Sequence, residues 1–263
     1  MEPQVQRLVD KVWKKFQETP QDRRLLIGIA GIPGSGKPLL TPLPHLTSHH
    51  RSKLTQPQGK TTLAQTLTNS LNSLSRQTSP SSPPPASFIP MDGFHLTRAA
   101  LSAMPDPATA HARRGAPFTF DAPKFLSLVQ SLREPISESS SSPGTIYAPS
   151  FDHAVKDPKE NDIAVLPTHR IVVLEGNYLA LDRDVWRDAA ALLDELWFVE
   201  VDFEVARKRL RERHVRAGIV NSLEEGDRRA MENDLVNGRE IVDFRLPVHE
   251  VIQSREDGSW VHE

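Results

Sequence analysis

The chain has 263 residues, a formal net charge of −2 and no cysteine. This length suits one α/β domain with insertions, and the near-neutral charge gives no overall field that would attract nucleic acid or a membrane surface. The lack of cysteine excludes disulfides, thiolate zinc sites and cysteine catalysis. No apolar run approaches the roughly 20 residues that span a bilayer, and the N-terminus lacks the apolar core of a signal peptide. We expect a single cytoplasmic domain over residues 1–263, without nucleic-acid or membrane partners.

Strands and helices are expected to alternate along the chain. Apolar residues at helical spacing predict an amphipathic helix between Val5 and Phe16. Two stretches rich in Ser and Pro, 78–87 and 137–143, are typical of flexible, exposed loops. The alternation indicates an α/β fold with a parallel sheet and helices on both faces. The other expected elements, in chain order, are strand Leu25–Ala30, helix Thr61–Ser75, strand Phe88–Met91, helix Pro123–Arg133, strand Arg170–Leu174, strand Glu195–Val201, helix Phe203–Ala217, helix Ser222–Val242 and strand Val248–Ser254.

A phosphate-binding loop follows the first strand, but it is divided in two. Residues 31–37 read GIPGSGK, and the next residue is a proline instead of the Ser or Thr that such a loop requires. The missing part begins at Gly59 and reads GKTTLAQTL. Deleting residues 37–59 joins the halves into GIPGSGKTTLAQTL, a complete P-loop that opens a helix. The candidate nucleotide-binding residues are Gly31, Gly34, Ser35, Gly36, Lys37, Gly59, Lys60, Thr61 and Thr62.

This motif predicts ATP and Mg²⁺ as ligands for physical reasons. Its glycines allow successive backbone N–H groups to surround phosphate oxygens, and the helix N-terminus adds a favourable dipole. The lysine reaches the β- and γ-phosphates, while the hydroxyl of the next residue binds the magnesium ion. Thr61 is therefore a candidate metal ligand.

The segment between the two halves has the composition of a loop. Residues 38–58 contain no acidic residue and no sustained helical or strand period. It is either an evolved insertion or a translated, retained intron. The second interpretation is favoured because Gly36-Lys37 can be encoded GGTAAG, Leu54-Thr55 CTAAC and Gln58-Gly59 CAAGGA, which supply a splice donor, a branch sequence and an acceptor.

Two closures of the divided loop are open. In one, the insert bulges out after Gly36, and Lys60 and Thr61 complete the site. In the other, Lys37 occupies the site and Pro38 begins the helix without a magnesium-binding hydroxyl. Closing a loop of about 20 flexible residues costs only a few kcal/mol, but the glycine loop and the helix are no longer directly continuous. We expect weaker ATP affinity than in a chain that lacks the insert.

Three polar clusters follow predicted strands or lie on a predicted helix. In parallel sheets, ligands bind at the carboxyl ends of the strands. Asp92, after the second strand, can accept a proton from a substrate hydroxyl. Glu175, after the strand that ends at Leu174, can lie beside magnesium or hold substrate hydroxyls. Arg209 and Arg213 share a helix face and can neutralise charge on a transferred phosphoryl group.

In this order the motifs resemble the uridine kinase, phosphoribulokinase and bacterial pantothenate kinase group of P-loop kinases, and most closely its fructose-kinase-like branch. The resemblance covers about residues 25–254 without the insert and is carried by PMDGFHL, RRGAPFTFD, APSFDH, VVLEGNYL, RKRLRERHVRAGI and ENDLVN, besides the P-loop. It implies a P-loop NTPase fold, a five-stranded parallel sheet flanked by helices, with a small lid.

The resemblance also implies roles for individual residues. Asp92 would be the catalytic base, Glu175 the acid near magnesium and substrate, and Arg209 and Arg213 the lid arginines. Asn233, Asp234 and Asn237 match a pattern of the group for which no role can be derived. The residues that would contact the acceptor are His95, Arg114, Asp121, Asp152, His153, Asn177 and Tyr178.

The function that we expect is transfer of the γ-phosphate of ATP to a hydroxyl of a nucleoside, a sugar or a pantothenate-like metabolite. The alternatives are a catalytically impaired or regulatory nucleotide-binding protein and an ATPase without a small-molecule acceptor. Sequence leaves the oligomeric state open, with a homodimer as one candidate.

Overall fold

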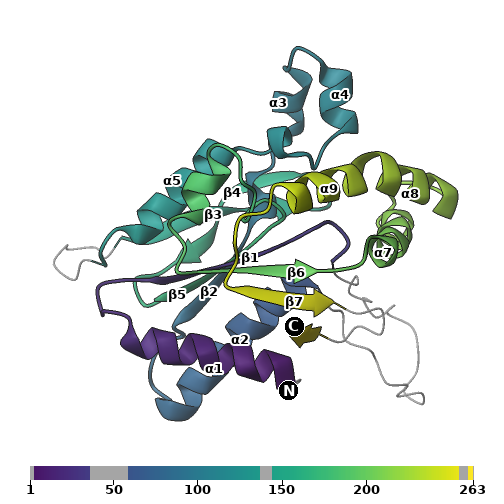
Figure 1. Cartoon of the computed structure of the whole chain (residues 1–263). Helices are drawn as coiled ribbons and strands as arrows, with labels where there is room; N and C mark the ends of the chain where they lie inside the picture. Colours follow the sequence, from purple (N-terminus) through teal and green to yellow (C-terminus); the bar gives the residue numbers. More distant parts are fainter. Residues whose placement is uncertain (1–2, 36–58, 137–143, 255–259, 263) are drawn as a thin grey trace, which may run out of the picture.

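A computed structural model describes residues 3–35, 59–136, 144–254 and 260–262. Its central sheet has the strand order β2-β5-β1-β6-β7-β8, and the first five of these strands are parallel (Figure 1). The expected α/β fold with a five-stranded parallel sheet is therefore confirmed. A sixth strand, β8, pairs antiparallel with β7 and was not expected. The strands are β1 (Leu25–Gly31), β2 (Ala86–Pro90), β5 (Ile171–Glu175), β6 (Glu195–Glu200), β7 (Glu250–Ser254) and β8 (Trp260–His262).

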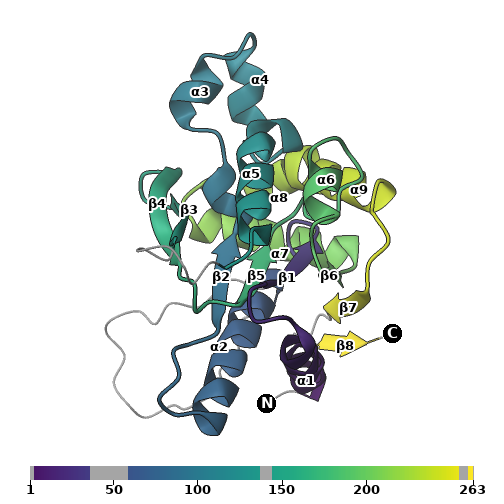
Figure 2. The same ribbon diagram turned by 90° about the vertical axis from the view of Figure 1, so that its left-hand side faces the viewer.

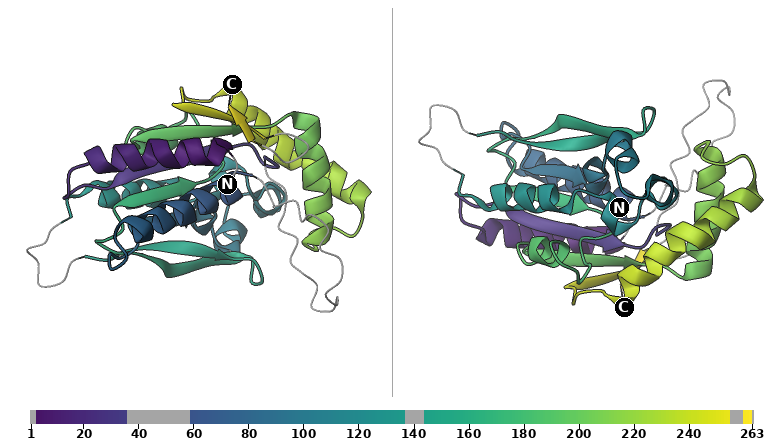
Figure 3. Two further views of the ribbon diagram at one scale, coloured as in Figure 1. Left: turned by 90° about the horizontal axis from the view of Figure 1, so that it is seen from below. Right: turned by 90° about the horizontal axis from the view of Figure 1, so that it is seen from above.

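Side chains of the parallel strands alternate between two hydrophobic cores. On one face, the strand residues pack against α1 (Pro3–Glu18) and α2 (Lys60–Thr78), which lie side by side below the sheet (Figures 1 and 3). The other face is covered by α5 (Ala122–Arg133), α6 (Trp186–Ala190) and elements of the C-terminal half (Figure 2). Burial on both faces explains the continuously apolar sequence of β1 and β5.

Most predicted elements occur with small shifts at their ends. The expected strand over 88–91 occupies Ala86–Pro90, because Met91 already begins a 3₁₀ turn, η1 (Met91–Phe94). The expected loop over 78–87 is shorter, since α2 continues to Thr78 and β2 begins at Ala86. The predicted loop over 137–143 and most of the insert lie outside the described residues.

The region between β2 and β5 contains structure that periodicity did not indicate. Two short helices, α3 (Arg98–Ser102) and α4 (Pro107–Ala112), project from the body (Figures 1 and 2). A 3₁₀ turn, η2 (Pro117–Thr119), precedes α5. Strands β3 (Ile146–Asp152) and β4 (Asp157–Val165) form a separate antiparallel hairpin. This hairpin packs against η1 and forms an ion pair, through Asp157, with Arg114.

The C-terminal helices lie beyond the carboxyl ends of β6 and β7 (Figure 1). Helix α7 (Phe203–Arg216) agrees with its prediction. The single helix expected over 222–242 is instead α8 (Leu223–Arg229), a π-helical segment η3 (Ala230–Asp234) and α9 (Leu235–Asp243). No helix of the described residues is long and apolar enough to cross a membrane.

Candidate active site

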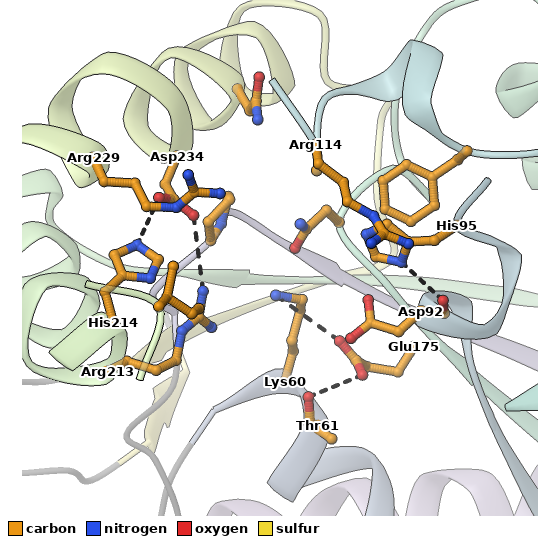
Figure 4. Close-up of a pocket in the computed structure, with 16 residues that line it drawn as sticks. Lys60, Thr61, Asp92, His95, Arg114, Glu175, Arg213, His214, Arg229 and Asp234 are labelled. Carbon is orange, nitrogen blue, oxygen red and sulfur yellow. Dashed lines mark hydrogen bonds and ion pairs between the residues drawn. The ribbon is translucent and has the colours of Figure 1, made fainter. Parts of the chain in front are cut away.

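A polar pocket opens at the carboxyl ends of β1, β2 and β5 (Figure 4). The strands are parallel, so the segments that follow them meet at this one edge of the sheet. Helix α7 and the π segment η3 provide the opposite wall. The lining residues are Pro33, Lys60, Thr61, Asp92, His95, Arg114, Gly115, Phe120, Glu175, Asn177, Arg213, His214, Ile219, Arg229, Asp234 and Asn237.

The glycine loop after β1 packs tightly against neighbouring backbone. Gly34 has a φ of 80°, and a Cβ there would lie 2.8 Å from the carbonyl oxygen of Ala206 in α7. A side chain at this position would be strained and would collide with the helix. Ser35 is fully buried beside this turn. Gly36 and Lys37 lie outside the described residues.

The second half of the divided motif returns to the glycine loop. Gly59 precedes α2 directly, and the ammonium of Lys60, in the first turn, donates a hydrogen bond of 3.4 Å to the carbonyl oxygen of Ile32. Thr61 lies beside it in the pocket, whereas the next residue, Thr62, does not line the pocket. This geometry is the closure in which Lys60 and Thr61 complete the site.

Glu175 joins the lysine and the threonine at the end of β5. Its carboxylate accepts a hydrogen bond of 2.9 Å from the Thr61 hydroxyl and lies 3.9 Å from the Lys60 ammonium (Figure 4). The pKa of Glu175 is raised to about 7, mainly by burial; Lys60 opposes this rise, nearby Asp92 adds to it, and the hydrogen bond from Thr61 opposes it. Burial likewise lowers the pKa of Lys60, against the attraction of Glu175. For both Glu175 and Lys60, the attraction between them does not fully offset the cost of burying their charges.

The oxygen atoms of Thr61 and Glu175 fit a magnesium ion. Mg²⁺ prefers hard oxygen ligands and is commonly held by one or two protein oxygens together with substrate phosphates. A hydroxyl and a carboxylate 2.9 Å apart supply such a pair. The described residues contain no group of three or more His, Asp or Glu side chains that would hold a metal ion by themselves.

Asp92 lies on the 3₁₀ turn after β2, with its side chain accessible from the pocket (Figure 4). This turn packs so closely against the β3–β4 hairpin that a Cβ on Gly93 would overlap the carbonyl oxygen of Pro149. Only glycine permits this approach. The MDGF sequence therefore presents a carboxylate to the pocket from a firmly packed turn.

His95 and Arg114 form the wall opposite α7. The Nδ1 atom of His95 lies 2.8 Å from the Asp92 carbonyl oxygen, and its ring stacks on Phe120 with centroids 4.0 Å apart. Burial lowers the pKa of His95, which favours a neutral ring that donates from Nδ1. Arg114 forms an ion pair of 3.0 Å with Asp157 of β4 and so joins this wall to the hairpin.

Several predicted acceptor residues lie outside the pocket lining. Asp121 caps the N-terminus of α5 by accepting from the Lys124 amide. Asp152 accepts two amide hydrogen bonds in the exposed turn of the hairpin, and His153 is exposed beside it. Tyr178 is buried and donates to the carbonyl oxygen of Gly115, so it supports the wall from behind. Asn177 lines the pocket as expected.

The two predicted lid arginines are separated by the structure. Arg213 lines the pocket and is half-exposed. Arg209 is buried and donates to the hydroxyl of Ser254 at 3.0 Å, away from the lining residues. The expectation that both face the pocket was wrong, because α7 packs against the end of β7 at Arg209.

Sequence reasoning assigned no role to some pocket residues. His214, Arg229, Asp234 and Asn237 complete the wall on the side of α7 and α9. Asp234 and Asn237 belong to the ENDLVN pattern, but the π segment that precedes α9 leaves no periodic signal in the sequence.

Comparison with known proteins identifies the family. No protein-family model matches the chain. It is 52% identical over 170 residues to the ATP-dependent kinase-like protein notR' of Aspergillus versicolor, covering 65% of this chain and 95% of the relative. It is 35% identical over 200 residues to the ATP-dependent kinase YFH7 of Saccharomyces cerevisiae, covering 65% of this chain but only 56% of YFH7.

The solved structure of Saccharomyces cerevisiae YFH7 superposes with a TM-score of 0.75 at 23% identity, over 95% of this chain and 98% of that one. At this identity the superposition supports the fold alone. The sequence identity to notR' over nearly its whole length supports the family. The chain belongs to the uridine kinase-like group of ATP-dependent P-loop kinases.

Proposed function

We propose that the protein transfers the γ-phosphate of ATP to a hydroxyl group of a small metabolite, with Asp92 as the general base. One observation carries this proposal. The pocket that holds Lys60, Thr61 and Glu175, the groups suited to a nucleotide and its metal, also exposes the carboxylate of Asp92. A base beside a phosphate site is what phosphoryl transfer to an acceptor requires.

The nucleotide would lie against the glycine loop and the start of α2. Backbone N–H groups of the loop and the helix dipole favour the phosphates, and Lys60 adds positive charge. Thr61 and Glu175 would hold Mg²⁺, which would supply positive charge to neutralise the phosphates. Its positive charge would also stabilise the carboxylate form of Glu175.

The acceptor would lie between Asp92 and the wall of His95, Arg114 and Asn177. Asp92 would orient the hydroxyl and take its proton as the new bond forms. Arg213, from the opposite wall, would stabilise negative charge on the transferred group. Nucleosides, sugars and pantothenate-like compounds are the acceptors to be screened.

The test is ADP formation by the full chain with ATP, Mg²⁺ and each acceptor in turn. We expect turnover that depends on the acceptor and that Asp92→Asn lowers by at least ~100-fold. Asp152→Asn is the matched control, because this aspartate lies in the exposed hairpin turn and should keep full turnover. Equal ADP formation without any acceptor would indicate an ATPase, and a chain that binds no ATP would contradict an enzymatic role.

A further inference from the structure

The ENDLVN segment, Glu232–Asn237, contacts both walls of the pocket. It begins in the π-helical segment η3 and continues into α9. A π turn adds one residue to a helical turn and so changes the direction of the side chains that follow, and such turns are frequent at functional sites. Three polar side chains of this segment, Asn233, Asp234 and Asn237, form hydrogen bonds or ion pairs with residues on the two sides of the pocket.

Two asparagines attach the segment to the acceptor wall, the side of the pocket formed by His95, Arg114 and Asn177. The guanidinium of Arg113 donates to Asn233 Oδ1 at 2.9 Å and to Asn237 Oδ1 at 2.7 Å. Asn233 donates in return to the carbonyl oxygen of Arg114 at 3.2 Å. Both asparagines are buried, so these bonds are shielded from competing water. The backbone that carries Asp234 is therefore held rigidly.

Asp234 turns the other way, toward the arginine helix. Its Oδ2 atom accepts a hydrogen bond of 2.8 Å from Nε2 of His214, and its Oδ1 atom lies 3.8 Å from the guanidinium of Arg213 (Figure 4). His214 is 2% exposed and is a fixed anchor. Arg213 has a side chain that is 44% exposed and would otherwise sample many rotamers.

We propose that Asp234 is a positioning residue that holds Arg213 in the orientation in which it contacts the transferred phosphoryl group. The inference rests on the proposed function, in which Arg213 stabilises that group. An arginine contributes most to phosphoryl transfer when its orientation is fixed before the reaction, since reorganisation then costs nothing. Asp234 supplies this constraint from a turn that is anchored on the acceptor wall.

The test compares the affinity of the full chain for ADP with its affinity for ADP plus aluminium fluoride, both with Mg²⁺. Aluminium fluoride occupies the place of the transferred group, so the gain in affinity reports the arginine without requiring a known acceptor. Asp234→Asn retains a hydrogen-bond acceptor for His214 but loses the charge that faces Arg213. We expect Asp234→Asn and Arg213→Ala each to reduce the gain roughly tenfold, with ADP affinity unchanged within about twofold.

The double variant separates positioning from a merely structural role. If Asp234 acts through Arg213, adding Asp234→Asn to Arg213→Ala causes no further loss. Asp227→Asn is the matched control, because Asp227 of α8 likewise forms an ion pair with an arginine of α7, Arg207, but lies outside the pocket lining. It should leave the fluoride gain unchanged.

The outcomes are distinguishable. A further loss in the double variant, or an equal loss of ADP affinity in Asp234→Asn, would overturn the positioning role while leaving the proposed function intact. A wild-type chain that binds ADP but gains nothing from fluoride would contradict phosphoryl transfer itself, and the inference with it.

Discussion

Two buried carboxylates lie at opposite ends of the parallel strands, and their pKa values are shifted in opposite directions. Glu175 ends β5 at the pocket, and its pKa is raised to about 7. Glu250 is the first residue of β7, at the amino ends of the strands, and its pKa is lowered to about 2. Both are mostly shielded from water, so burial alone does not explain the difference.

The difference arises from the cations around each group. Burial also raises the pKa of Glu250, but hydrogen bonds from Arg7 and Lys11 of α1 outweigh it. Glu175 has Lys60 at 3.9 Å and a second acid, Asp92, nearby. The charge of Glu250 is already neutralised by Arg7 and Lys11, and these ion pairs connect α1 to the sheet. The surroundings of Glu175 contain too little positive charge, which suits a site that is completed by a magnesium ion.

The largest expected effect separates the two carboxylates by function. Glu175→Gln removes the carboxylate that we propose as a magnesium ligand, and we expect Mg²⁺-dependent turnover with the acceptor from the screen to fall by at least ~100-fold. Glu250→Gln should leave turnover within about twofold but lower the free energy of unfolding by about 1–3 kcal/mol, since Arg7 loses its carboxylate partner and Lys11 keeps only Glu195. Steady-state assays and urea unfolding of both variants measure this. Similar profiles for the two variants would contradict the division of roles.

A second prediction concerns the divided chain at the site. Deleting residues 37–59 joins the glycine loop directly to Lys60, and we expect ATP affinity to rise by roughly tenfold or more, because the loop and α2 become one rigid unit. The structural cluster at Glu250 is remote from this change, so the pH dependence of unfolding should persist. Titration of ATP into both chains decides the matter, and equal affinities would refute it. Sequencing the transcript tests separately whether these codons occur in every mature messenger RNA.

The smallest effect is a pair of opposite pH dependences. Glu250 has a folded pKa of about 2, below its ordinary 4.5, so its contribution to stability is complete above pH 4.5 and is lost as pH falls toward 2. Glu175 has a folded pKa of about 7, above 4.5, so stability falls as pH rises from 4.5 toward 7. Urea unfolding at pH 5 and pH 8 without Mg²⁺ should show a decrease that Glu175→Gln reduces and Glu250→Gln does not. An unchanged decrease in Glu175→Gln would argue against the raised pKa.

Local sequence was sufficient for the parts of the site that follow strands. The apolar runs before Asp92 and Glu175 predicted buried parallel strands, and parallel strands bring their carboxyl ends together. The GIPGSGK and GKTT halves likewise predicted a nucleotide loop by their residue types alone. These inferences depend only on short-range patterns, and each pattern is contained within a few neighbouring residues.

Other features depended on contacts between distant segments. The family resemblance implied that Asp121 and Asp152 contact the acceptor, but Asp121 caps a helix and Asp152 accepts amide hydrogen bonds in a turn. A short motif does not distinguish these roles. Arg209 and Arg213 are one helical turn apart, yet packing against Ser254 buries the first and leaves the second at the pocket. The β3–β4 hairpin lacked a clear period because much of it faces solvent.

The sequence by itself determined the family's order of motifs, the parallel sheet and the two acids at its carboxyl edge, since each is encoded within a few neighbouring residues. Only the tertiary structure decided that Lys60 and Thr61 lie beside Glu175, and that Asp234 faces Arg213. Such pairings join residues far apart in the chain, and they are fixed by the packing of whole elements, which no local pattern records.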